Sequence, residues 1–167
     1  MNRNTLRILA FVFLAFMAIP AWAEDTTVTL SLDGNPSLAL TAPAAAKVIS
    51  SNGYVNIKTT NMSLHVWVAP RAATAKDALP DVPELIKGEF VKFKTKDIKD
   101  VGIAGAPAKH VFGSGNEADD GDPGNAEVVL FVVGGRVFAG CVHGEFDDAA
   151  RASAPMMAVL RTARKVP

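Results

Sequence analysis

The sequence predicts an α/β sandwich in which a mainly antiparallel sheet, built from two meanders, is covered by helices. Three observations predict this class: short apolar segments of β-branched residues, turn dipeptides between them, and a helical pattern after each run of strands. In segments 127–133 and 136–142, apolar residues occupy both odd-numbered and even-numbered positions, and therefore both faces of each predicted strand. A strand with two apolar faces is covered on both sides, so we expect these two at the centre of the sheet.

The first predicted meander begins with a hairpin. Segments 47–50 and 54–58 flank Asn52-Gly53, a pair that suits the positive φ angles of a type I′ turn. After a second turn, segment 63–69 alternates apolar and polar residues with the period of a strand. Three strands are therefore expected in sequence order.

A broken helical connection is predicted to follow these strands. Residues 72–79 are rich in alanine and favour a helix that Pro80 ends. Asp81 followed by Glu84 resembles a capping box, which restarts a short helical turn over residues 83–87.

The second predicted meander has four strands. They are expected at residues 89–99, 108–112, 127–133 and 136–142. Residues 113–125 are rich in glycine and aspartate, which predicts a long loop before the last two strands. Gly134-Gly135 suits a two-residue hairpin turn between those strands.

The C-terminus predicts a helix with one apolar stripe. Met156, Val159, Leu160 and Ala163 form the stripe, and Arg161, Arg164 and Lys165 lie on or near the last turn. Pro155 is expected in the first turn, because a proline inside a helix costs about 3 kcal/mol. Residues 147–154 are then expected to form a separate short turn.

The N-terminus predicts a secretory signal peptide over residues 1–23. Two cations precede the apolar run 8–19, which is about 12 residues long and shorter than the roughly 20 that span a bilayer. Ala21-Trp22-Ala23 then offers small residues at the two positions that a signal peptidase reads. The mature protein is expected to be residues 24–167, a single globular domain in the periplasm or secreted, with no transmembrane segment.

Composition limits the partners and the cross-links. The chain carries 17 cations and 17 anions, a balance that gives no reason to expect nucleic acid as a partner. Cys141 is the single cysteine, so no disulfide forms within the chain. The oligomeric state and the identity of any protein partner stay open.

Three segments in this order carry a family resemblance. They are Pro36-Ser-Leu-Ala-Leu40, Ile103-Ala-Gly-Ala-Pro-Ala-Lys109 before a hairpin, and the closing helix Met157-Ala-Val-Leu-Arg-Thr-Ala-Arg164. Together with the order of elements they resemble the PsbP-like α/β/α sandwich superfamily, in its bacterial exported, DcrB-like branch. The resemblance implies accessory factors that bind partner proteins and share no active site, so no functional residue transfers to a numbered position.

No catalytic residue is predicted. His65, His110 and His143 are the candidate bases, but the sequence contains no Gly-x-Ser-x-Gly elbow, and Ser114 lies in a simple Gly-Ser-Gly turn. We therefore expect a protein that is not an enzyme. A small exported enzyme without a recognisable motif is an alternative.

No metal or cofactor site is predicted either. Cys141 and His143 lie two apart on one predicted strand, so both side chains point to one face, as two ligands of a soft metal would. Two ligands do not close a tetrahedral site, and His65 or His110 would complete it only if the fold brought one of them close. A buried thiol beside a histidine at the strand end is the favoured interpretation.

Two charged segments stand out. The acidic loop 117–125 offers oxygen ligands for calcium, but it lacks the spacing and terminal glutamate of an EF-hand, so a solvated loop is favoured. A basic stripe consists of Lys87, Lys92, Lys94, Lys96 and Lys99. These lysines either meet an anionic partner or protect an edge strand from pairing with other chains, and the second reading is favoured.

The sequence thus predicts an exported, periplasmic, non-catalytic accessory or protein-binding module. A type VI secretion immunity or adaptor protein is a further alternative, by analogy of fold. The Asn61-Met-Ser63 glycosylation sequon is attributed to chance.

Overall fold

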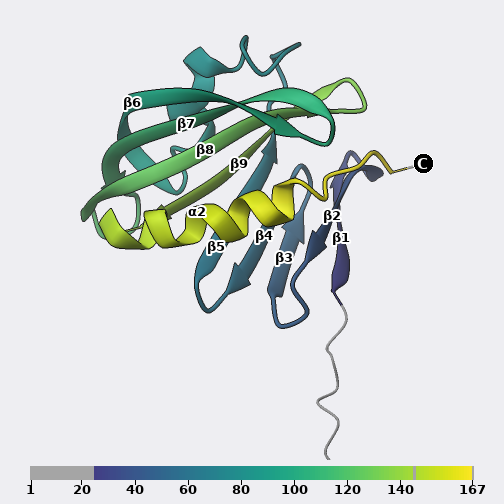
Figure 1. Cartoon of the computed structure of the whole chain (residues 1–167), viewed down its shortest axis with the longest axis horizontal. Coiled ribbons are helices and arrows are strands. Elements are labelled where there is room, and N and C mark those ends of the chain that lie inside the picture. Colours follow the sequence, from purple (N-terminus) through teal and green to yellow (C-terminus); the bar gives the residue numbers. More distant parts are fainter. Residues whose placement is uncertain (1–24, 145, 167) are drawn as a thin grey trace, which may run out of the picture.

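Seven antiparallel strands form the main sheet of the computed structural model, which describes residues 25–144 and 146–166 (Figure 1). The strands of this sheet are β3 (Lys47–Ser51), β4 (Tyr54–Thr59), β5 (Met62–Val68), β6 (Phe90–Ile103), β7 (Ala106–Glu117), β8 (Pro123–Val133) and β9 (Arg136–Gly144). Their spatial order is β3-β4-β5-β9-β8-β7-β6, so both β8 and β9 are interior strands, as predicted. The predicted signal peptide lies outside the described residues.

A separate hairpin lies beside the main sheet and was not anticipated. It consists of β1 (Thr26–Leu32) and β2 (Asn35–Ala42), joined at Asp33-Gly34. Both turn residues have positive φ angles, 52° and 78°, as a type I′ turn requires. The aspartate–glycine pair was the available signal for this hairpin.

The predicted β3–β4 hairpin is present, but its turn is not of type I′. Gly53 has a positive φ of 71°, whereas Asn52 does not. The Asn52 side chain is held elsewhere, because its Oδ1 accepts a 2.6 Å hydrogen bond from the Asp33 N–H. The turn conformation is therefore set by contact with the neighbouring hairpin.

The predicted long loop at residues 113–125 is wrong. Strand β7 continues to Glu117 and β8 begins at Pro123, so the connection is short. Gly113 and Gly115 lie inside β7 because β6 passes too close for a side chain: a Cβ on Gly113 would lie 2.3 Å from the Phe93 ring. These glycines mark close packing and not a turn.

The predicted helix over residues 72–79 is also wrong. The helical residues here are the 3₁₀ turn η1 (Leu79–Asp81) and α1 (Val82–Leu85). Asp81 is the N-cap of α1 without a side-chain capping bond, so the expected capping box does not form. A short alanine-rich run gains little as a helix, and here Ala75 and Ala78 are buried against the sheet instead.

Helix α2 (Phe146–Leu160) starts earlier than expected and contains Pro155 in its interior. The predicted separate turn at 147–154 is therefore absent, and the basic residues follow the last turn. The apolar stripe is confirmed, because Met156, Val159 and Leu160 are buried. Packing against β8 and β9 outweighs the hydrogen bond that the proline removes.

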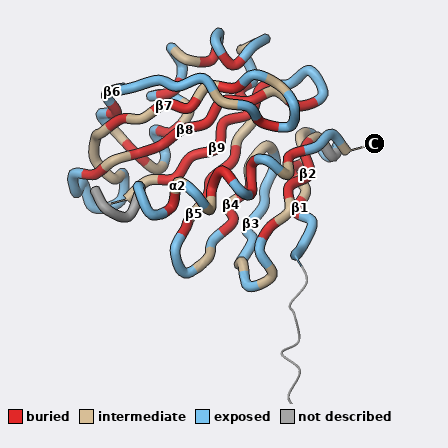
Figure 2. The backbone as a smooth tube through the Cα atoms, in the orientation of Figure 1, coloured by how far each residue is buried: buried red, intermediate tan, exposed pale blue. Residues whose placement is uncertain are grey.

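The sheet has one apolar core on each face. Helix α2 and the β1–β2 hairpin cover the first core, and the segment from Ala69 to Phe93 covers the second. In Figure 2 the tube of β8 and β9 is red along most of its length, in agreement with burial on both faces. No helix in the described part of the chain is long and apolar enough to cross a membrane.

Candidate functional site

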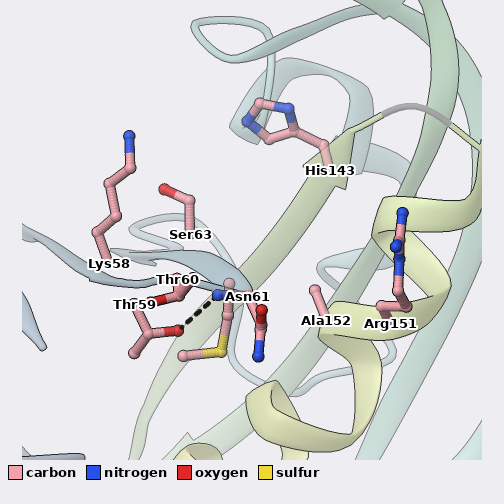
Figure 3. A pocket seen from close by; sticks show the side chains of 9 residues that line it. Lys58, Thr59, Thr60, Asn61, Ser63, His143, Arg151 and Ala152 are labelled. Carbon is pink, nitrogen blue, oxygen red and sulfur yellow. Dashed lines mark hydrogen bonds between the residues drawn. The ribbon is translucent and has the colours of Figure 1, made fainter. Parts of the chain in front are cut away.

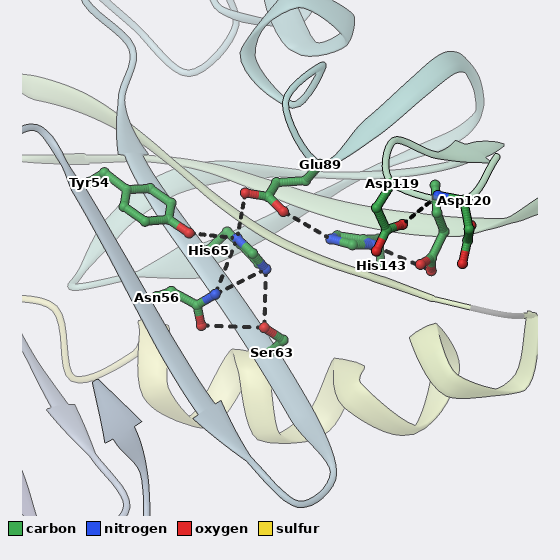
Figure 4. A network of polar contacts seen from close by, with 9 residues as sticks. Tyr54, Asn56, Ser63, His65, Glu89, Asp119, Asp120 and His143 are labelled. Atoms are coloured by element: carbon green, nitrogen blue, oxygen red, sulfur yellow. Dashed lines mark hydrogen bonds and ion pairs between the residues drawn. The ribbon is translucent and has the colours of Figure 1, made fainter. Parts of the chain in front are cut away.

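Two histidines and a glutamate meet on the face of the sheet opposite α2 (Figure 4). His65 Nδ1 lies 3.2 Å from Glu89 Oε1, and His143 Nε2 lies 3.8 Å from Glu89 Oε2. One ligand atom from each of the three residues lies within 4.8 Å of the other two. We call these three residues the histidine–glutamate cluster.

Strand pairing explains how residues so distant in sequence come together. His65 on β5 pairs with Cys141 on β9, and His143 lies two residues further along β9 on the same face. The two imidazole rings are 5.3 Å apart. Glu89 enters from the turn between α1 and β6, where its N–H donates to the Ile86 carbonyl.

Hydrogen bonds hold the His65 ring on both sides. The Tyr54 hydroxyl lies 3.0 Å from Nδ1, and Ser63 Oγ lies 3.1 Å from Nε2. Ser63 in turn donates to Asn56 Oδ1 at 3.3 Å. With the proton on Nε2, a chain of donors runs from His65 through Ser63 to Asn56, and the Nδ1 lone pair faces Tyr54 and Glu89.

Burial keeps His65 neutral. It lowers the pKa of His65 to about 4, and the nearby His143 and Lys58 add to the effect. Burial also raises the pKa of Tyr54, whose phenol therefore stays protonated and able to donate. A neutral imidazole is the form that binds a metal ion or accepts a proton.

His143 has an unusual environment for a polar ring. Both ring nitrogens are buried, and neither makes a hydrogen bond within residues 25–144 and 146–166. Its two nearest carboxylates, Glu89 at 3.8 Å and Glu117 at 3.5 Å, are too distant for good hydrogen bonds. The ring also packs 5.9 Å from Phe90.

The acidic loop lies next to this cluster. Glu117, Asp119 and Asp120 hold carboxylate oxygens within 4.8 Å of one another, and the two aspartates are exposed. Backbone bonds stabilise the loop, since the Glu117 N–H donates to the Asp122 carbonyl and the Ala118 N–H donates to the Glu89 carbonyl. The loop therefore joins the turn that carries Glu89.

A surface cavity of about 320 Å³ reaches the cluster (Figure 3). Residues of the β4–β5 turn, the end of β9 and the first half of α2 line it, among them Lys58, Ser63, His143 and Ala152. The cavity therefore reaches the cluster at His143, whereas His65 is buried behind Ser63.

Cys141 and His110, the other candidate residues, are not members of this cluster. Cys141 is fully buried, and burial raises the pKa of its thiol, with Glu89 and Glu127 adding to the effect. His110 lies on the opposite face, where its Nε2 is 2.9 Å from Glu127 Oε2. Ser153 of α2 donates to the same carboxylate oxygen at 2.6 Å, so His110 belongs to a buried structural pair.

The basic stripe divides into two parts. Lys87 pairs with Glu84, and Lys99 pairs with Asp97. Lys92, Lys94 and Lys96 are exposed on the edge strand β6 and line one recess of about 370 Å³ together with Ser114 and Asn116. We call this feature the lysine recess.

Strand β6 is irregular where the three lysines of the recess lie. The β6–β7 register shifts between Val91 and Lys94 and again between Thr95 and Asp97, and Lys92 has a positive φ of 54°. No ion pair connects these lysines to a carboxylate within the described ranges.

Sequence reasoning named both histidines of the cluster but did not join them. It missed Glu89 entirely, because that residue lies in a turn with no motif around it. The available signal was the alternation of side chains along a strand, which puts Cys141 and His143 on one face. Only the pairing of β5 with β9 shows that His65 lies beside them.

No family model matches this sequence, and no curated protein matches it. Solved structures match in fold. The solution structure of a cyanobacterial PsbP (CyanoP) from Synechocystis sp. PCC 6803 matches with a TM-score of 0.51 at 10% identity, covering 86% of this chain and 94% of that chain. The crystal structure of LpqN, involved in cell envelope biogenesis of Mycobacterium tuberculosis, matches with a TM-score of 0.48 at 14% identity, covering 86% of this chain and 91% of that chain.

The chain therefore has a PsbP-like fold, as the resemblance implied. Its placement in the DcrB-like branch stays a prediction. A likeness at this identity concerns the fold alone, so the function has to be argued from the chain's own residues.

Proposed function

We propose that this chain is an exported, non-catalytic accessory protein that binds an acidic partner through the lysine recess. The leader-like N-terminus supports export, with the periplasm of a Gram-negative bacterium as the compartment. The PsbP-like fold is compatible with an accessory role. The observation that carries the proposal is the convergence of three exposed lysines on one recess.

The charge of the recess favours a carboxylate-rich or phosphate-rich partner. Lys92, Lys94 and Lys96 lie close together, and no described carboxylate pairs with them. An acidic surface placed there gains three favourable charge interactions. Ser114 and Asn116 add hydrogen-bonding groups to the same wall. Edge protection alone explains exposed lysines but does not require their convergence.

The test replaces all three recess lysines with glutamate. We expect K92E/K94E/K96E to lose a partner that wild type captures from periplasm under gentle crosslinking, with a nearly unchanged melting temperature. Each exposed charge contributes about 1 kcal/mol or less to stability. K47E/R71E/K76E changes three exposed cations elsewhere by the same total charge and should retain the partner. Equal capture by all three proteins would return the lysines to an edge-protecting role.

One observation favours a second candidate, a serine hydrolase. Ser63 Oγ, His65 Nε2, His65 Nδ1 and Glu89 Oε1 follow one another at the spacings of a nucleophile, a base and an orienting carboxylate. Ser63 also lines the cavity.

Two features of the same residues oppose the hydrolase. A pKa of about 4 makes His65 a weak base near neutral pH, and the Ser63 hydroxyl donates to Asn56 instead of to His65. A fluorophosphonate probe, which labels activated serines, decides between the candidates. Labelling of wild type but not of Ser63→Ala would favour the hydrolase.

A further inference from the structure

We propose that the histidine–glutamate cluster binds one divalent transition-metal ion of the zinc class through His65, Glu89 and His143. This site is independent of the lysine recess, which lies on β6 and β7. The argument rests on spacing, on the unpartnered ring of His143 and on the hydrogen bonds behind His65.

The spacing of the ligand atoms fits a zinc-sized ion. Ligands at roughly 2.0–2.1 Å from a tetrahedral zinc ion lie about 3.3 Å from one another. His65 Nδ1 lies 3.2 Å from Oε1 of Glu89, and His143 Nε2 lies 3.8 Å from Oε2, so each histidine faces one oxygen of the same carboxylate. One ligand atom from each of the three residues lies within 4.8 Å of the other two, so an ion that binds all three would draw them closer together.

His143 lacks the partners that a buried imidazole normally has. Among the residues that the structure describes, its two buried ring nitrogens have no hydrogen-bond partner, which costs about 1–3 kcal/mol for a polar group. The Nε2 atom faces Glu89 Oε2 across a gap that is too long for a hydrogen bond. A cation between these atoms would satisfy both the nitrogen lone pair and the carboxylate.

His65 already has the support that a metal-binding histidine needs. Metal-bound histidines donate their second ring N–H to a fixed acceptor, which orients the ring. Ser63 Oγ lies 3.1 Å from His65 Nε2 and is itself held by Asn56 Oδ1. The Nδ1 lone pair then faces both Glu89 and the Tyr54 hydroxyl, and a bound zinc ion would replace the hydrogen bond from Tyr54.

The donor set selects the class of ion. Two imidazoles and one carboxylate suit zinc and its first-row neighbours, whereas magnesium and calcium prefer oxygen ligands throughout. Three protein ligands leave a fourth position open. The cavity lined by Ser63 and His143 gives water, or an anionic group of a bound molecule, access to that position.

Isothermal titration of tag-free, EDTA-treated protein with zinc chloride tests the proposal. We expect one zinc ion per chain, a zinc-dependent rise in melting temperature, and no comparable response to calcium. Glu89→Gln should weaken zinc binding more than about 100-fold, since even outer-sphere changes cost about 10–100-fold. Ser63→Ala should weaken it by about 10-fold for that outer-sphere reason.

Matched variants keep the outcome decisive. D119N/D120N removes two neighbouring carboxylates outside the cluster and should leave zinc affinity unchanged. If Glu89→Gln fails to fold, His143→Gln replaces it, and the visible spectrum of the cobalt-substituted protein reports the ligand set directly. Absence of binding up to about 1 mM zinc, which means a Kd above about 1 mM, would overturn the proposal. So would zinc binding that D119N/D120N abolishes and Glu89→Gln does not.

Discussion

Gly115 lies on β7 where β6 passes close to it, and Gly115→Ala is expected to destabilise the protein. A Cβ at this position would lie 2.5 Å from the Val91 carbonyl oxygen and 2.7 Å from the Phe90 ring. Contacts of a real Cβ below 3.0 Å are essentially not observed, so the β6 backbone has to move by about half an ångström. Overpacking of this kind costs about 1–3 kcal/mol.

Gly102→Ala is the matched control on the same pair of strands. Gly102 lies on β6 opposite Pro107, and a Cβ there meets nothing within 4 Å. Alanine restricts the unfolded chain in both variants and contributes about 0.4–1 kcal/mol of stability in each. The difference between the two variants therefore isolates the clash at Gly115.

Urea unfolding followed by circular dichroism measures that difference. We expect Gly115→Ala to be about 1–3 kcal/mol less stable than Gly102→Ala, or about 3–10 °C lower in melting temperature for a chain of this size. Phe90 also contacts His143 and follows Glu89, so Gly115→Ala should weaken zinc binding as well. Equal stabilities for the two variants would refute the close approach of β6 and β7.

The other predictions concern His65 and Cys141. The folded-state pKa of His65, about 4, lies below its unfolded value of 6.5, so its contribution is fully present above pH 6.5 and is lost as the pH falls through 4. Metal-free protein should lose up to about 3 kcal/mol of stability over that range. The loss should be smaller in His65→Gln, which lacks this imidazole; an identical pH profile would contradict the assignment. Cys141 should react with a thiol reagent only at the rate of unfolding, because it is fully buried and burial raises the pKa of its thiol. Rapid stoichiometric labelling of native protein would show that β9 is exposed.

Local patterns in the sequence determined where most strands of the main sheet lie along the chain and which two lie at its centre. Segments 127–133 and 136–142 carry apolar residues on both faces, and they form the interior strands β8 and β9. Gly134-Gly135 predicted a hairpin, and both residues have positive φ angles. These features depend on neighbours in sequence, so a single sequence contains the information for them.

Tertiary contacts decided the features that local patterns suggested wrongly. Gly113 and Gly115 looked like loop residues, but they are strand residues that Phe90 and Phe93 cover. Pro155 looked like a helix start, but burial of Met156 and Leu160 keeps it inside α2. In each case packing free energy from distant residues outweighed the local conformational preference.

The candidate site was determined almost wholly by the tertiary structure. The sequence showed that His143 shares a strand face with Cys141. Pairing of β5 with β9 then placed His65 beside them, and the turn after α1 contributed Glu89. A site whose members come from three separate segments depends on strand order and register, and these are settled by burial of the two apolar cores.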